Sequence, residues 1–229
     1  YDNWPTYLLF RHICHSNVLL LNLVQIIVAI FYFIINYHNI NHSYHRRIQL
    51  EPNRKSVCVF CGSRAGKAPE YTVEANKLGQ IIAKNNWRLV YGAGSVGLMG
   101  ILANAVQFNK GEILGVIPKH LLEKEVGKTD LSTFIVTENM HERKKVMFMN
   151  SDFVIILPGG IGTLDEFFEI LTWKQLGLHG KKIIIINING YWDKLIELLD
   201  QLVTSEFADL SINNYFVVID SADEILETI

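Results

Sequence analysis

The chain has 229 residues, and its 49% of hydrophobic residues are enough for one sizeable core rather than two. The formal net charge is −2, and the chain beyond residue 50 holds 18 Lys and Arg against 22 Asp and Glu. A mildly acidic domain argues against nucleic acid as the main partner, although it leaves room for a local basic pocket. Three cysteines are too few for a disulfide framework, which indicates a reducing, cytoplasmic compartment.

The first fifty residues differ in composition from the rest of the chain. Residues 18–35 are apolar except for Asn22 and Gln25, and this run just reaches the length of a membrane-spanning helix. Because no methionine precedes Met99, a second interpretation is translated upstream sequence absent from the mature protein, and a third is a soluble amphipathic extension. We divide the chain into an N-terminal extension over residues 1–54 and a main domain over residues 55–229. Membrane association is expected only if residues 18–35 are a real anchor.

Beyond residue 55, apolar runs alternate with helical patterns. The runs predict about seven strands, at residues 57–61, 88–91, 113–117, 134–137, 153–157, 183–186 and 216–219. Helices are predicted over residues 69–85, 97–108, 140–150, 167–176 and 192–202, with short pieces within 119–132 and from residue 222. The apolar positions of the first helix are Val73, Leu78, Ile81 and Ile82. Continuous apolar strands alternating with helices predict a doubly wound, Rossmann-like α/β fold with a parallel sheet covered on both faces.

A C-x-x-C pair, Cys58 and Cys61, lies on the first predicted strand. Such a pair is found in redox and zinc sites, but residues three apart on a strand point to opposite faces of the sheet. The two thiols would therefore converge poorly on a metal ion, and no second C-x-x-C pair follows. We expect no metal site here.

A glycine-rich turn, Gly92-x-Gly94-x-x-Gly97, stands between the second predicted strand and a helix. It matches a dinucleotide-binding pattern, but it follows the second strand rather than the first. The acidic residue that should end the next strand is missing, because Glu112 precedes that strand. We therefore interpret this turn as close packing and one wall of a nucleotide pocket, not as an NAD site.

A second glycine-rich turn follows the fifth predicted strand and opens a helix. Its glycines, Gly159, Gly160 and Gly162, let the backbone approach a ligand that any Cβ would block. Thr163 stands where a helix N-cap would stand, and the free amides at such a helix start bind phosphate. Glu166 lies three residues further on and could close a capping box. The turn is therefore either a tight, capped connection or a phosphate-binding loop with a working carboxylate.

Five segments occur in one order: VCVFCGS at residues 57–63, YGAGSVGLMG at 91–100, MHERK at 140–144, PGGIGTLDE at 158–166 and TWKQLG at 172–177. Together they resemble the Lonely Guy family, the cytokinin riboside 5′-monophosphate phosphoribohydrolases, which are often misnamed lysine decarboxylases. The resemblance extends from about residue 55 to the C-terminus. It implies hydrolysis of an N-glycosidic bond without a metal or organic cofactor.

The resemblance also implies the site residues. Arg143 and Glu166 match the catalytic pair. The implied substrate contacts are Glu125, Arg143, Lys144, Gly160, Ile161, Gly162, Thr163, Leu164, Asp165, Glu166 and Thr172. Glu123 is an alternative to Glu125, and Asp165 replaces a glutamate that is commoner in the family.

The residue types themselves suggest a separate role for each group in binding and cleaving a nucleoside monophosphate. The amides of residues 160–163 would bind the phosphate, together with a cation from Arg143 or Lys144. Glu166 would stabilise the oxocarbenium-like transition state of glycosidic cleavage, and Arg143 would donate to the departing purine. Two alternatives stay open: Arg143 and Lys144 as a solvated helix face, and the acids as partners of the helix dipole. His141 and His179 are weaker candidates for an acid.

The expected activity is release of a free base and ribose 5-phosphate from a cytokinin nucleotide or from AMP. We also expect a homodimer, with Trp173, Met147 and Met149 in the core or at the subunit contact. Lysine decarboxylation is rejected, because no lysine stands in the strand or turn context that pyridoxal phosphate requires. The rival function is a nucleotide-binding or carrier module, similar to the molybdenum-cofactor carrier proteins, with the same phosphate turn and no turnover.

Overall fold

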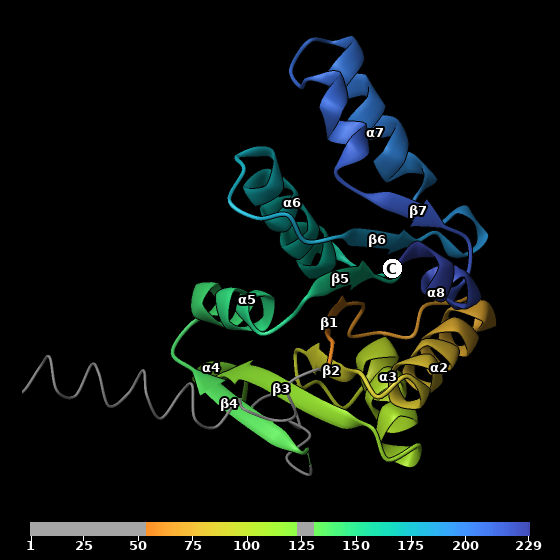
Figure 1. The fold of residues 1–229 in the computed structure, drawn as a ribbon, viewed down its shortest axis with the longest axis vertical. Helices are drawn as coiled ribbons and strands as arrows, with labels where there is room; N and C mark the ends of the chain where they lie inside the picture. The colour runs from red at the N-terminus through yellow and green to blue at the C-terminus, as the bar shows by residue number, and fades with distance from the viewer. Residues whose placement is uncertain (1–53, 123–130) are drawn as a thin grey trace, which may run out of the picture. The chain divides into compact units, whose positions relative to one another are not determined.

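A seven-stranded parallel sheet forms the centre of the molecule (Figure 1). The structure is a computed structural model that describes residues 54–122 and 131–229. The strands are β1 (Ser56–Phe60), β2 (Arg88–Tyr91), β3 (Glu112–Pro118), β4 (Thr133–Thr137), β5 (Phe153–Ile156), β6 (Ile183–Ile186) and β7 (Val217–Ile219). Their order is β4-β3-β2-β1-β5-β6-β7, with parallel pairing throughout. The predicted doubly wound fold is confirmed, and the winding reverses between β1 and β5.

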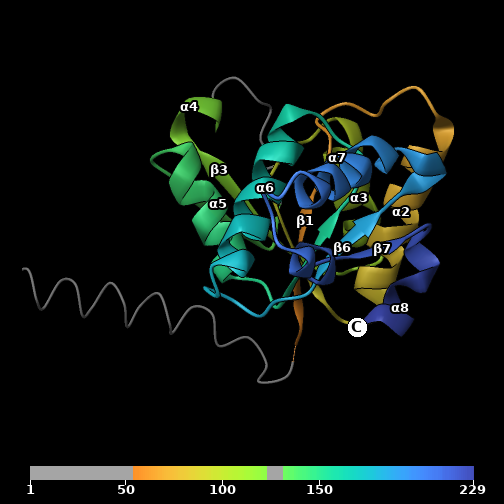
Figure 2. The same ribbon diagram turned by 90° about the horizontal axis from the view of Figure 1, so that it is seen from above.

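Two groups of helices cover the two faces of the sheet (Figure 1). The helices are α2 (Pro69–Lys84), α3 (Gly97–Phe108), α4 (Lys119–Leu122), α5 (Met140–Met149), α6 (Ile161–Gln175), α7 (Asp193–Thr204) and α8 (Ile225–Thr228). Three short 3-10 helices are η1 (Ile188–Gly190), η2 (Leu210–Asn214) and η3 (Ala222–Glu224). Helices α2, α3 and α8 share one hydrophobic core with the sheet, and α5, α6 and α7 share the other. In both views α6 lies between α5 and α7 (Figures 1 and 2).

Strand β1 shows how the sequence divides these two cores. Val57 and Val59 belong to the core under α2 and α3, whereas Cys58 belongs to the core under α5 to α7. Cys61, just beyond the strand, packs with the first group. The prediction that Cys58 and Cys61 face opposite sides of the sheet is therefore confirmed.

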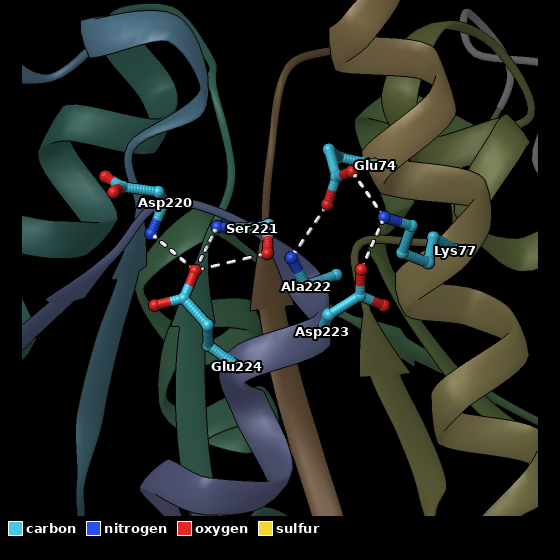
Figure 3. A network of polar contacts seen from close by, with 7 residues as sticks. All are labelled: Glu74, Lys77, Asp220, Ser221, Ala222, Asp223 and Glu224. Atoms are coloured by element: carbon cyan, nitrogen blue, oxygen red, sulfur yellow. Dashed lines mark hydrogen bonds and ion pairs between the residues drawn. The ribbon is translucent and has the colours of Figure 1, made fainter.

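A polar network ties the C-terminal segment to α2 (Figure 3). The buried carboxylate of Glu74 accepts a hydrogen bond of 2.7 Å from the backbone N–H of Ala222. Lys77 bridges Glu74 at 2.9 Å and Asp223 at 2.8 Å, and Ser221 begins η3 with a complete capping box. Val73, one of the apolar positions of α2, is nevertheless 57% exposed, because the buried face of the helix includes its polar neighbour Glu74.

The other differences from the sequence prediction lie at element ends. Helix α6 begins at Ile161, before the start implied by an N-cap at Thr163 and before the amphipathic pattern over residues 167–176. Pro118 is the last residue of β3 rather than the residue after it. The 3-10 helices η1 and η2 were not predicted, since they lack the apolar periodicity of longer helices. Within residues 54–122 and 131–229, no helix is both long and apolar enough to span a membrane. The predicted extension and its apolar run over residues 18–35 lie outside these residues, apart from Arg54.

Candidate functional site

A cavity of about 300 Å³ opens beyond the carboxyl ends of β1, β2 and β5, at the reversal of the winding. Its lining comes from the end of β1 and the loop after it, the loop after β2, helices α3, α4 and α5, and the first turn of α6 with the residue before it. Arg143 and Glu166 both line this cavity, as do the backbones of Gly160 and Gly162. The fold therefore brings together residues that are 23 positions apart in the chain and come from two different helices.

Backbone contacts hold the loops around the cavity together. The N–H of Gly62 donates to the carbonyl of Pro158 at 3.0 Å, and the N–H of Leu98 donates to the carbonyl of Gly62 at 3.1 Å. Gly97 has a φ of +63°, and a Cβ there would overlap the backbone of Ser63. The three loops after β1, β2 and β5 thus form one rigid rim.

Gly160, not Thr163, is the N-cap of α6. The helix begins at Ile161, and the N–H of Leu164 donates to the carbonyl of Gly160 at 3.1 Å. The prediction of an N-cap and capping box at Thr163 is therefore wrong. Thr163 is buried in the first turn, where its side chain packs so tightly against Gly159 that a Cβ on Gly159 would overlap it. The first amides of α6 lack helical partners and remain available to a ligand at the turn.

The glycines of the turn differ in what they are needed for. Gly159 has no room for a side chain because Thr163 fills the space. A Cβ added at Gly160 or Gly162 would meet nothing within 4 Å, and both positions are exposed. Packing therefore does not require glycine at positions 160 and 162, whereas close approach of a ligand would.

Arg143 is a buried arginine held by backbone carbonyls. Helix α5 starts at Met140 behind Asn139, whose side chain accepts from the N–H of Glu142, and this start turns Arg143 toward the sheet. Its Nε donates to the carbonyl of Val116 at 3.1 Å, and its Nη2 donates to the carbonyl of Gly92 at 2.9 Å. The alternative of a solvated helix face is wrong for this residue, which is 7% exposed.

Lys144 is buried beside Arg143 but does not line the cavity. Its ammonium group lies 2.8 Å from Asp165 and 3.2 Å from Glu169, both on α6. These ion pairs, together with the hydrogen bonds they contain, raise the pKa of Lys144 although its burial opposes this. In this structure, Lys144 joins α5 to α6, and its charge is balanced by two carboxylates.

Glu166 is the partly buried carboxylate of the cavity. Burial raises the pKa of this carboxyl to about 7, and the negative charges of Asp165 and Glu169 act in the same direction. The positive charges of Arg143 and Lys144 oppose the rise. A carboxyl group with this pKa is poised to take or give a proton near neutral pH. Asp165 and Glu169 differ from Glu166, because both are paired with Lys144.

The remaining predicted residues lie elsewhere. Leu164 packs partly buried against the core, and the exposed Thr172 donates through its hydroxyl to the carbonyl of Phe168 at 2.7 Å. Neither lines the cavity. Glu125 and its alternative Glu123 lie outside the described residues.

The two histidines proposed as acids also lie away from the cavity. His141 is exposed on α5. His179 accepts at Nδ1 from the N–H of Lys181 and so donates from Nε2 to the carbonyl of Ile170 at 2.9 Å. Its ring lies 4.7 Å from that of Phe148, and burial lowers its pKa. His179 therefore has a packing role where α5 and α6 end.

A second cavity of about 490 Å³ adjoins the first and shares Gly62, Ser63, Gly160 and Ile161 with it. Tyr71 and Tyr191 form one wall, with their rings 5.5 Å apart in an edge-to-face arrangement. The hydroxyl of Tyr191 donates to the carbonyl of Gly159 at 2.6 Å. Sequence reasoning missed this wall. The usable signal is that Tyr191 follows β6, whose carboxyl end meets the same edge of the sheet.

A doubly wound sheet with a glycine turn, a buried arginine and a carboxylate of raised pKa at its switch point is typical of enzymes that act on nucleotides. A family model described as "possible lysine decarboxylase" matches residues 99–229. The probable cytokinin riboside 5′-monophosphate phosphoribohydrolase LOG4 of Oryza sativa subsp. japonica is 42% identical over 172 residues, 75% of this chain and 75% of the relative. The phosphoribohydrolase LOG5 of Arabidopsis thaliana is 41% identical over 173 residues, 76% of each chain. The chain therefore belongs to the family of the cytokinin riboside 5′-monophosphate phosphoribohydrolases. The resemblance inferred from its motifs is confirmed.

Among solved structures, the molybdenum cofactor carrier protein of Chlamydomonas reinhardtii has a similar fold. Its TM-score is 0.59 at 20% identity, over 77% of this chain and 96% of that chain. At this identity the likeness concerns the fold alone.

Proposed function

We propose that this chain hydrolyses the N-glycosidic bond of purine riboside 5′-monophosphates and releases the free base and ribose 5-phosphate. The names of relatives that are 42% and 41% identical to this chain support the substrate class. The observation that carries the proposal is the shared cavity, into which Arg143, Glu166 and the open glycine turn all project. Its volume of about 300 Å³ is at the lower end of the range for small-molecule sites, which suits one nucleotide.

Glu166 has the properties that the cleavage step needs. As a carboxylate it would stabilise the positive charge that develops on the ribose as the bond breaks. Because burial raises its pKa to about 7, it would also accept a proton from the attacking water at neutral pH. The amides at the start of α6 would fix the phosphate so that the anomeric carbon lies near this carboxylate.

Arg143 would assist departure of the base. Two of its N–H groups are committed to the carbonyls of Val116 and Gly92, which fix the guanidinium plane. An arginine does not release its proton at neutral pH, so we assign it a hydrogen bond to the leaving purine rather than full proton transfer. Glu125 and Thr172 stay predicted substrate contacts on the strength of the family motifs.

The test measures release of free base from AMP and from an N6-prenylated AMP, with calorimetric binding of both compounds. Glu166→Gln keeps the shape of the side chain and removes its charge. It should lower turnover by roughly 100-fold or more while nucleotide still binds. Glu197→Gln on α7, an exposed carboxylate far along the chain, is the control and should leave turnover unchanged. Wild-type turnover by Glu166→Gln would contradict the mechanism.

The same experiment tests the rival function expected from the sequence, a nucleotide-binding or carrier module. A carrier module needs the phosphate turn but not the carboxylate in the cavity. Binding of AMP by the wild-type protein without release of base from either compound would favour the carrier.

We also propose a cytoplasmic homodimer. Met149 at the end of α5 and Leu176 and Leu178 after α6 are all more than 60% exposed. The rings of Phe148 and Trp173 lie 5.2 Å apart, so these ends of α5 and α6 are neighbours. An exposed apolar patch of this kind supports a subunit contact. Light scattering should give twice the monomer mass, and Leu178→Asp should reduce it to the monomer mass.

A further inference from the structure

The sequence suggested Arg143 or Lys144 as the cation that binds the substrate phosphate, but in the structure both side chains are engaged by other groups. Lys144 is neutralised by Asp165 and Glu169 and does not line the cavity. Arg143 is drawn toward the carbonyls of Val116 and Gly92 and serves the chemical step. A phosphate at the start of α6 would carry close to two negative charges, and backbone amides alone balance them poorly.

Arg64 lies directly beside the turn, in the loop between β1 and α2. Its side chain is exposed, lines the second cavity, and makes no ion pair with any residue of the described chain. The backbone of Arg64 is closely packed against Gly62, since a Cβ added at Gly62 would lie 2.9 Å from the carbonyl oxygen of Arg64 and 3.4 Å from Cα of Gly159. The loop is further pinned by the hydrogen bond from Gly62 to Pro158.

The two cavities meet at the residues that would hold the phosphate. Gly62, Ser63, Gly160 and Ile161 line both of them, so an anion on the first amides of α6 would lie where the cavity lined by Glu166 adjoins the cavity lined by Arg64. The carbonyl oxygen of Gly159, which would repel an anion, is already paired with the hydroxyl of Tyr191. The second cavity, with a volume of about 490 Å³, thus has room for a guanidinium group beside the phosphate.

We propose that Arg64 binds the 5′-phosphate of the substrate from the second cavity and makes the protein select nucleoside monophosphates over nucleosides. This inference rests on the proposed hydrolase function and adds to it a residue that the family motifs did not supply. The planar guanidinium can form two parallel hydrogen bonds to phosphate oxygens, a geometry that a lysine lacks.

The experiment compares Arg64→Ala, Arg64→Lys and the control Lys67→Ala. Lys67 is an exposed cation in the same loop that does not line the second cavity, so it reports on long-range charge alone. For each variant, kcat/KM is measured with AMP and with adenosine, and binding of ribose 5-phosphate is measured by calorimetry. Arg64→Ala should lower kcat/KM for AMP by roughly 10- to 100-fold, mainly through KM, and leave the rate with adenosine unchanged. Arg64→Lys should fall between wild type and alanine, and Lys67→Ala should change kcat/KM by less than about threefold.

An equal loss for AMP and adenosine, or an undiminished preference for AMP in Arg64→Ala, would overturn the assignment. The binding measurement separates this inference from the hydrolase function. Suppose that the wild-type protein releases no base, and that Arg64→Ala is the one variant that loses affinity for ribose 5-phosphate. The hydrolase function is then wrong, and the assignment of Arg64 to phosphate binding is supported. If the wild-type protein does not bind ribose 5-phosphate at all, the Arg64 site is wrong, whatever the activity.

Discussion

Gly92 is the residue that gives Arg143 its place, and Gly92→Ala tests this. A Cβ built on Gly92 would lie 1.9 Å from Nη2 of Arg143 and 3.0 Å from its Cζ. Real Cβ atoms stay at least 3.0 Å from their neighbours, so the guanidinium has to move by about 1 Å or more. The φ of Gly92 is outside the left-handed region, so alanine suits the backbone and the clash is the whole perturbation.

The displacement should appear in the chemical step. A misplacement of about 1 Å in a catalytic group costs on the order of 100-fold in rate, so we expect kcat to fall by about that factor with a smaller change in KM. Moving Arg143 away also weakens the positive charge that lowers the pKa of Glu166, so the acid limb of the pH–rate profile should shift to higher pH. Gly180→Ala is the control, because a Cβ at Gly180 would meet nothing within 4 Å.

The assay is steady-state release of base across the pH range, with thermal unfolding as a check that the fold persists. The double variant Gly92→Ala, Arg143→Ala should be no slower than Arg143→Ala alone, because the first change acts only through the arginine. If Gly92→Ala keeps the wild-type kcat and pH profile, or if the two losses multiply, Gly92 does not position Arg143 and the reasoning is refuted.

Five further expectations follow from the contacts described above. Because burial raises the pKa of Glu166 to about 7, kcat/KM should fall about tenfold for each pH unit below 7. Glu166→Gln should melt a few degrees above wild type at pH 8, where the folded protein holds a costly charge, and this advantage should vanish below pH 4.5, where the carboxyl is protonated in both states. Gly160→Ala should weaken calorimetric AMP binding without lowering the melting temperature, since its Cβ meets only open space. Lys144→Met should cost about 1–2 kcal/mol in urea unfolding, because it strands two carboxylates of which one is largely exposed. Glu74→Ala should cost about 1–3 kcal/mol by leaving a buried N–H unpaired, with kcat unchanged.

The sheet and most helices could be predicted because their signals are local. Runs such as residues 183–186, four consecutive isoleucines, allow few alternatives to a buried strand, and β6 has these bounds. Helix α3 also has its predicted bounds, since glycine at its start and the apolar periodicity agree. The start of α6 was harder to predict. Its N-cap is a glycine, Gly160, whereas the hydroxyl of Thr163, which resembled a capping group, packs against Gly159.

The site was predictable as a set of motifs but not as a set of contacts. The motifs named Arg143 and Lys144 as one unit, yet consecutive helix residues point about 100° apart, and the structure gives them different partners. For Arg64 and Tyr191 the sequence showed only that each follows a strand, because their position at the turn depends on which strand ends lie side by side. Which loops lie side by side at the edge of the sheet follows from the strand order, and no local sequence pattern encodes that order.

The placement of the cavity at the reversal of the winding also has a consequence for how the protein acquires activity. β1 pairs with β2, where Ser56 lies opposite Arg88, and on its other side with β5, where Val57 lies opposite Phe153. The first pairing closes a loop of about thirty residues and the second a loop of nearly a hundred, so the second has the larger entropic barrier. The half of the sheet that carries Gly92 can therefore form before the half that carries Glu166 docks against it. A newly made or refolding chain would form helices and strands before it can bind nucleotide. The pairing of β1 with β5 would be the step that completes the active site.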